Sequence, residues 1–155
     1  MLPSDAYRTK LHETIAALRY WVPTLRHVAD AEDVETEAYW RLAVRPRTAQ
    51  ACPFELILHS DQHYDLLIGN EVFERRPVES LGAFQPLLEA IAAGRVITRH
   101  WFTVATGSLA AIETIVTPAG GTDWRRIRRM APLERVPLEE CHAVDRHYVR
   151  YARGE

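Results

Sequence analysis

The chain has 155 residues, of which 47% are hydrophobic and 26% are charged. This balance is typical of a globular protein, and it excludes a largely disordered chain, a collagen-like repeat and a coiled coil. The formal net charge of -2 at pH 7 excludes a global electrostatic field that would hold the whole molecule on nucleic acid or on an anionic membrane. The length predicts one domain, residues 1–155, that folds without disulfides or metals.

Cysteine usage and apolar runs indicate where the protein resides. Cys52 and Cys141 lie far apart and form no Cys-x-x-Cys pair, which is typical of a reducing compartment. The first residues lack the basic flank and apolar core that secretion requires, and no apolar run reaches the ~18 residues of a membrane span. Arginine makes up all but one of the basic residues, a bias that we attribute to GC-rich codon usage. We expect a soluble, cytoplasmic, bacterial protein with no membrane partner.

An amphipathic helix is predicted at the N-terminus, over residues 4–29. Ser4 is a suitable N-cap residue, and Pro23 predicts a kink or break followed by a short continuation. The apolar residues that recur at spacings of three and four are Tyr7, Leu11, Ile15, Leu18, Val22 and Leu25. Residues 30–37 are rich in acids, and we interpret them as a solvated acidic connector, because they lack the glycine and the spacing of a calcium loop.

The middle of the chain predicts an antiparallel meander. Apolar and polar residues alternate over residues 39–45, 54–59 and 64–68, as in strands with one buried face. Gly69-Asn70 predicts a tight two-residue turn into a further strand at 71–73.

A second helix and two more strands are predicted next. Residues 80–93 have helical periodicity, with Ser80 as a possible cap and Gly94 just beyond the end. Residues 96–105 alternate but are apolar on both faces, which predicts a strand in the interior of the sheet. A further strand is expected over 111–117.

The last quarter of the chain is less regular. Residues 122–130 fit either a helical turn or a strand, and we favour the strand because Gly120-Gly121 suits a hairpin. Pro137 is suited to open a C-terminal helix over residues 137–151. The apolar face of that helix would contain Leu138, Cys141, Val144, Tyr148 and Tyr151.

These elements predict a single α+β domain. It would have an antiparallel sheet of about six strands, an N-terminal helix, one mid-chain helix and a C-terminal helix, with a sheet-and-helix core over residues 38–130. The element order resembles that of type III secretion chaperones, which are small dimeric proteins built as helix, three strands, helix, two strands, helix. The resemblance is in element order and rests on no motif.

Imidazoles and carboxylates alternate at His59, Asp61, His63 and Asp65. On one extended strand all four side chains would face the same way, as a metal site requires. The same stretch also fits a hairpin with Asp61 and Gln62 in the loop, and that register sends the two histidines to opposite faces. We therefore expect a turn with exposed histidines and no metal.

A second candidate is the basic run near residue 125. Its members are Trp124, Arg125, Arg126, Arg128 and Arg129. Four arginines beside an aromatic ring are suited to grip phosphates and stack on a base. Since acids are plentiful elsewhere in the chain, a solvated face whose arginine stems cover apolar surface is the favoured interpretation.

Two further residue groups are weighed as sites. His100 and Trp101, on the predicted interior strand, are candidates for the wall of a ligand pocket. Cys141 and His142 are candidates for a thiol and its base, but adjacent residues on a helix point about 100° apart, so a buried inert thiol is preferred.

No motif predicts a catalytic residue, a cofactor or a metal: a nucleophile elbow, a Walker loop and a dinucleotide fingerprint are all absent. The favoured hypothesis is a non-catalytic protein-interaction or binding domain that acts as a homodimer, with an interface centred on Trp40 or Trp101. The alternative is a ligand-binding protein or enzyme with a pocket near His100 and Trp101. A third hypothesis is weak nucleic-acid binding through Arg125 to Arg129.

Overall fold

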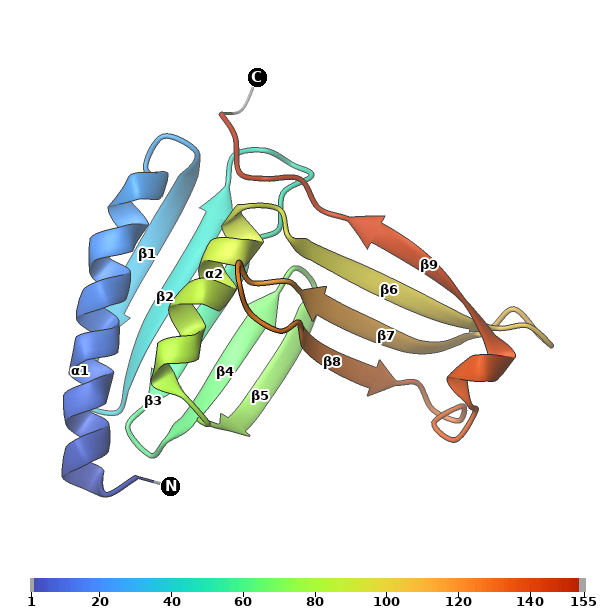
Figure 1. Ribbon diagram of the computed structural model, residues 1–155, viewed down its shortest axis with the longest axis horizontal. Helices are drawn as coiled ribbons and strands as arrows, with labels where there is room; N and C mark the ends of the chain where they lie inside the picture. The colour runs from blue at the N-terminus through green and yellow to red at the C-terminus, as the bar shows by residue number, and fades with distance from the viewer. Residues whose placement is uncertain (1, 154–155) are drawn as a thin grey trace.

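The computed structural model describes residues 2–153. Its helices and strands are α1 (Ser4–Trp21), β1 (Ala29–Glu35), β2 (Tyr39–Pro46), β3 (Phe54–His59), β4 (His63–Ile68), β5 (Glu71–Pro77), α2 (Phe84–Ala92), β6 (Val96–Thr103), β7 (Leu109–Val116), β8 (Trp124–Arg129) and β9 (Cys141–His147). The protein is an α+β structure with two antiparallel sheets (Figure 1). The first sheet has the order β1-β2-β3-β4-β5, and the second has the order β8-β7-β6-β9.

The N-terminal helix is shorter than predicted. α1 ends at Trp21 instead of residue 29, because Pro23 cannot donate a helical hydrogen bond; a 3-10 turn, η1 (Val22–Leu25), follows. The break at Pro23 is thus confirmed. The buried stripe of α1 consists of Tyr7, Ile15 and Leu18. Within residues 2–153, neither helix is long and apolar enough to cross a membrane.

Most of the predicted acidic connector, residues 30–37, is instead a strand, because β1 includes residues 30–35. β1 pairs with β2 along its whole length, and all of its side chains except the first are exposed. Arg19 of α1 neutralises part of the charge, with contacts of 2.8 Å to Asp33 and 2.9 Å to Glu35. A run of acids suits this position, because charged side chains on an edge strand discourage another chain from pairing with it.

The predicted meander is confirmed. β2 to β5 pair in chain order, and alternate side chains point inward. On β2 the buried residues are Trp40, Leu42 and Val44. The tight turn at Gly69-Asn70 joins β4 to β5, and the positive φ of 61° at Gly69 is the conformation for which glycine is favoured.

The mid-chain helix lies on the same face of the first sheet as α1 (Figure 1). Ser80 makes no side-chain cap, so the segment begins with a 3-10 turn, η2 (Leu81–Ala83), and α2 follows. The first sheet and both helices enclose the main core, to which α2 contributes Phe84, Leu87, Leu88, Ala90 and Ile91.

The prediction of one sheet of about six strands is wrong. The strands form two separate sheets, one of five strands and one of four. The edge of the first sheet is closed at β5 by a bulge, by Arg75 in a left-handed conformation and by Pro77, so the next strand does not add there. β6 lies inside the second sheet, between β7 and β9, as predicted. Residues 124–129 form the strand β8, as favoured over a helix.

The predicted C-terminal helix over residues 137–151 is wrong. A single 3-10 turn, η3 (Leu138–Glu140), precedes β9, which pairs with β6 through all seven of its residues. β6 supplies backbone hydrogen-bond partners along the whole of this strand. The helical spacing of the apolar residues gave no sign of this pairing. With five strands between two helices and no third helix within residues 2–153, the element order also differs from that of the chaperones named above.

The second sheet is attached to the core at only one end. Val96, Val116 and Tyr148 belong to the main core, and Trp124 packs against it. From there the sheet extends away from both helices, toward the right of Figure 1. An ion pair of 2.8 Å between Glu71 of β5 and Arg128 of β8 joins the two sheets. The far half of the second sheet therefore projects from the body of the molecule.

Candidate functional site

The projecting sheet exposes an aromatic strip on one face. We call this the core-side face, because Val96 and Val116, which belong to the main core, lie on the same face of the sheet. Farther out, the rings of His100, Phe102 and His142 lie nearly parallel, with centroids 6.4 Å and 5.6 Å apart for the two successive pairs. Val144, beside His100 in the register, is 52% exposed. Neither α1 nor α2 covers this half of the sheet (Figure 1).

The opposite face of the sheet carries a row of charges. Arg99 bonds Asp145 at 2.7 Å and lies 4.0 Å from Glu113 on the other neighbouring strand. The hydrogen bond from Arg99 holds the pKa of Asp145 below its usual value. Trp101 is covered by this row, since its indole N–H donates to Glu113 at 3.4 Å and the Arg99 guanidinium lies over its ring. His100 and Trp101 thus occupy opposite faces of β6 and do not line one pocket.

β9 leaves one side of its backbone open. At its two ends, Val104 donates to Glu140, and Tyr148 donates to Val96. Because alternate residues of an antiparallel strand direct their backbone groups to the same side, the even-numbered residues of β9 bond to β6. The outward N–H and C=O groups belong to Cys141, Ala143, Asp145 and His147. None of the hydrogen bonds found within residues 2–153 uses these outward groups.

The other three sheet edges are protected against pairing. β1 carries a run of acids, and β5 has a bulge and ends at Pro77. β8 carries four arginines in six residues. β9 differs, since it contains one acid and one arginine, Asp145 and Arg146. It is the edge of this fold that is best suited to accept another strand.

His59 and His63 share a face, contrary to the expected register. Leu58 lies opposite Tyr64, so the turn contains the three residues 60–62 and His59 faces His63. The expected two-residue loop is wrong because Gln62 adopts a positive φ of 65° and thereby adds a residue to the turn. Even so, no group of three or more His, Cys, Asp or Glu side chains in the described part of the chain is arranged to hold a metal ion.

Asp65 connects His59 to the β5 bulge. Its carboxylate contacts Nε2 of His59 at 2.8 Å and accepts the backbone N–H of Arg75 at 2.7 Å. Burial acts to raise the pKa of Asp65, but the hydrogen bonds from Arg75 and His59 outweigh it and hold the pKa below its usual value. Arg75 has a φ of 52°, which is unfavourable for a side chain with a Cβ. The cluster thus stabilises a strained bulge.

Asp65→Ala is therefore expected to lower the free energy of unfolding by about 1.5 kcal/mol, since it removes charge-assisted hydrogen bonds from a half-buried site. Asp61→Ala is the matched control: Asp61 also contacts Arg75, but its side chain is 52% exposed, and the expected loss is below about 0.5 kcal/mol. Urea titration followed by tryptophan fluorescence measures both. Equal losses in the two variants would contradict the structural role of Asp65.

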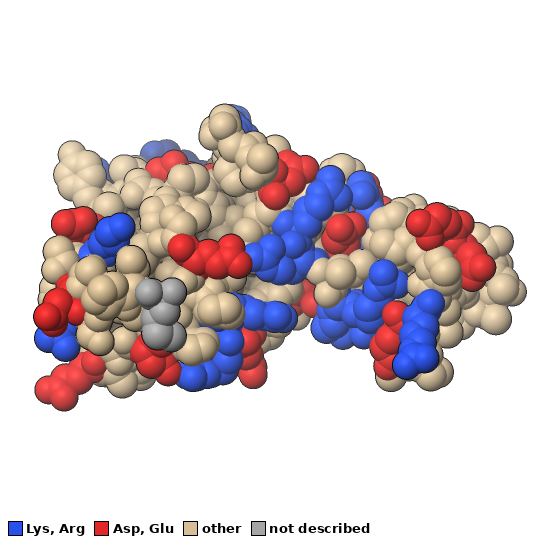
Figure 2. All heavy atoms as spheres, turned by 60° about the horizontal axis from the view of Figure 1, so that its bottom comes forward, with Lys and Arg blue, Asp and Glu red and all other residues tan. Residues whose placement is uncertain are grey.

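The arginines of β8 do not form one basic patch. Arg126 and Arg128 point to the core-side face, whereas Arg125 and Arg129 point to the other. Arg128 is paired with Glu71, and Arg125 lies 3.3 Å from Asp123. Figure 2 shows basic and acidic side chains interleaved on this side of the molecule. Trp124 packs edge-on against Phe73, so its ring is not free to stack on a base.

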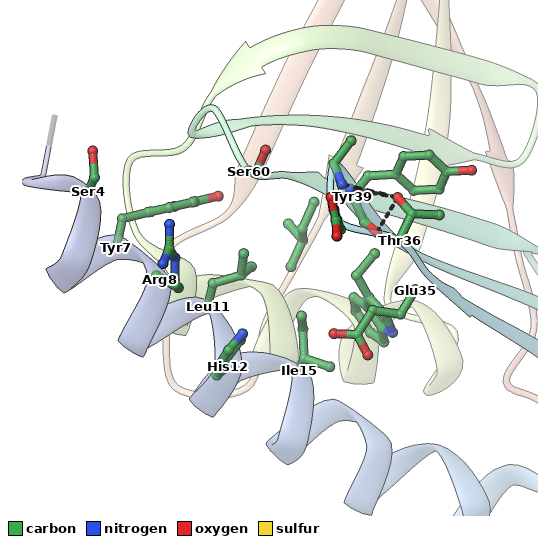
Figure 3. Close-up of a pocket in the computed structure, with 14 residues that line it drawn as sticks. Ser4, Tyr7, Arg8, Leu11, His12, Ile15, Glu35, Thr36, Tyr39 and Ser60 are labelled. Carbon is green, nitrogen blue, oxygen red and sulfur yellow. Dashed lines mark hydrogen bonds between the residues drawn. The ribbon is translucent and has the colours of Figure 1, made fainter.

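A cleft of about 890 Å³ lies between α1 and the turn from β1 to β2 (Figure 3). Its floor is apolar and includes Ile15, Trp40 and Leu58. Two of the polar groups that line it are engaged: Glu35 is bonded to Arg19, and the Tyr7 hydroxyl donates to the carbonyl of His59 at 2.8 Å. Burial raises the pKa of Tyr7 to about 12. Neither Glu35 nor Tyr7 is therefore poised to act as an acid, base or nucleophile in this cleft.

The two thiols are not arranged for chemistry. Cys52 is fully buried, and burial raises its pKa to about 12, which keeps the sulfur protonated. Cys141 is half-buried on β9, and His142 points to the opposite face of the same strand. The thiol and imidazole that were weighed as a catalytic pair are therefore not brought together.

Sequence reasoning missed both the open edge and the cleft. The edge was assigned to a helix, although Val144 has the β-branched side chain that is typical of strands. The cleft involves Glu35, which was assigned to a connector.

Comparisons of the chain with protein-family models, with curated proteins and with solved structures found no match.

Proposed function

We propose that this protein is a non-catalytic protein-interaction module that acts as a homodimer, joined along β9 of its second sheet. The observation that carries the proposal is the row of outward backbone groups on β9, at an edge with little charge of either sign. Unpaired strand edges are templates for strand addition, in which main-chain hydrogen bonds supply affinity.

Three reactive side chains are either bonded to a partner or buried, which supports binding over catalysis at these positions. The imidazole of His59 is bonded to Asp65, and Glu35 at the cleft is bonded to Arg19. Cys52 is buried. The proposed interface is not centred on Trp40 or Trp101, the residues expected from the sequence. Trp40 is only 1% exposed, inside the core, and Trp101 is covered by its charged neighbours.

The test uses Ala143→Pro, which removes an outward N–H and leaves the bonds of β9 to β6 in place. Light scattering after size-exclusion chromatography should give twice the 17.8 kDa mass of one chain for the wild type and 17.8 kDa for this variant at the same concentration. Proline is tolerated where the N–H of an edge strand faces outward, so the circular dichroism spectrum should be unchanged.

Ala143→Thr is the matched control, because threonine has a β-branched side chain but keeps the N–H, and it should remain a dimer. A wild-type protein that stays at 17.8 kDa at high concentration overturns the proposal. A dimer that persists in Ala143→Pro also overturns it, because the contact then lies elsewhere.

A further inference from the structure

Symmetry restricts how two copies of β9 can pair. A two-fold axis perpendicular to the sheet keeps each side chain on the same face in both copies, so one residue of β9 must lie opposite its own symmetry mate. The pairing must also set outward groups against outward groups, which are those of Cys141, Ala143, Asp145 and His147. Only a few registers meet both conditions.

We infer that two copies join with Val144 on the two-fold axis, an inference that rests on the proposed function. Ala143 then bonds Asp145 of the second copy, and Cys141 bonds His147. All outward residues of both strands are used, which gives about eight backbone hydrogen bonds. The two four-stranded sheets become one continuous antiparallel sheet, and the core-side faces of the two copies form one surface.

The neighbouring registers are less favourable. Placing Asp145 on the axis sets two carboxylates directly against each other, which is destabilising. Placing Ala143 on the axis leaves His147 opposite η3, which is not extended and cannot continue the ladder. The free edge also ends just past His147, because Val149 already donates its outward N–H to Gln50 at 3.1 Å. The register centred on Val144 uses all of the free edge, which runs from Cys141 to His147.

Side chains support the same register. With Val144 on the axis, Arg146 lies opposite His142 of the second copy and diagonal to its Glu140, so that long side chains of opposite charge come within reach of each other twice. Asp145 already has Arg99 as its partner, at 2.7 Å, so its charge is compensated within its own copy. Val144 is 52% exposed in the single chain and would contact its mate across the axis.

The experiment is a cysteine scan of the full chain in a Cys141→Ser background; Cys52 remains because it is buried. At the axis the two Val144 backbones approach to about 4.5 Å between Cα atoms, within the range of a disulfide. Val144→Cys should therefore form a covalent dimer under mild oxidation. Ala143→Cys and Arg146→Cys are matched controls that lie farther from their mates, and both should stay largely monomeric on a non-reducing gel.

The outcomes separate the register from the dimer. A wild-type dimer that cross-links at Val144 and not at the controls supports the inference. A wild-type dimer that Ala143→Pro dissociates but that cross-links through Ala143→Cys instead overturns the register and leaves the edge dimer standing. A wild-type protein that is monomeric at every concentration overturns both proposals.

Discussion

Gly94→Ala is expected to lower the free energy of unfolding by about 3 kcal/mol, because two costs add at this position. Gly94 follows α2 with a φ of 79°, a left-handed conformation that disfavours any residue with a Cβ. An added Cβ would also lie 2.5 Å from the backbone nitrogen of Arg150 and 2.8 Å from the carbonyl carbon of Val149. Backbone atoms cannot turn aside as a flexible side chain can.

The clash would displace the C-terminal segment that crosses the end of α2. Tyr151 holds that segment through its N–H, which donates to Ala92 at 2.9 Å, and through its hydroxyl, which donates to the carbonyl of Cys52. Urea unfolding of the variant measures the loss. Gly107→Ala is the matched control, with a φ of 72° and nothing within 4 Å of the added Cβ, and should cost about 1 kcal/mol. Equal losses in the two variants would contradict the proposed clash.

Arg128→Met should destabilise the protein by about 2 kcal/mol, since it leaves a buried carboxylate without its partner. Glu71 is only 6% exposed, and its two oxygens accept from Nε and Nη2 of Arg128 at 2.9 and 2.8 Å. The hydrogen bond to Glu71 raises the pKa of Arg128 above its usual value, so the guanidinium is charged over the working pH range. This pair ties the second sheet to the first, and its loss should loosen the projecting sheet.

A double-mutant cycle isolates the Glu71–Arg128 interaction. Arg128→Met should cost much less when Glu71→Gln is already present, because a neutral amide tolerates the missing guanidinium; the coupling should be about 1.5 kcal/mol. Arg126→Met is the control, since Arg126 is on the same strand and face but lies over the Trp124 ring and has no acid partner among residues 2–153. Additive losses of Glu71→Gln and Arg128→Met would show that the two side chains do not act together.

Local patterns were enough to predict most of the first sheet. Alternation over residues 39–45 and 54–59 reports directly which side chains face the core, because the side-chain period of a strand is two. Gly69 predicts the turn in which it lies, since few other residues adopt a positive φ at low energetic cost. Pro23 marks the end of α1 for the equally local reason that it lacks an N–H.

The predictions that failed had two kinds of cause: some depended on partners distant in the chain, and one depended on a local turn. The acids of residues 30–35 form a strand because β2 pairs with them and Arg19 of α1 neutralises part of their charge. The face shared by His59 and His63 depends on a single extra residue in a turn, and one residue reverses every side chain of a strand.

The sequence by itself determined the α+β class and the α1 stripe, because helix and strand periods are properties of consecutive residues. Only the tertiary structure decided that the strands divide into two sheets and that residues 141–147 form a strand instead of a helix. The spacing of Cys141, Val144 and Tyr148 suits a helix, yet the backbone groups of β6 pair with residues 141–147. The hydrogen bonds of a helix lie within the segment itself, whereas those of a strand come from another part of the chain, which no local pattern records.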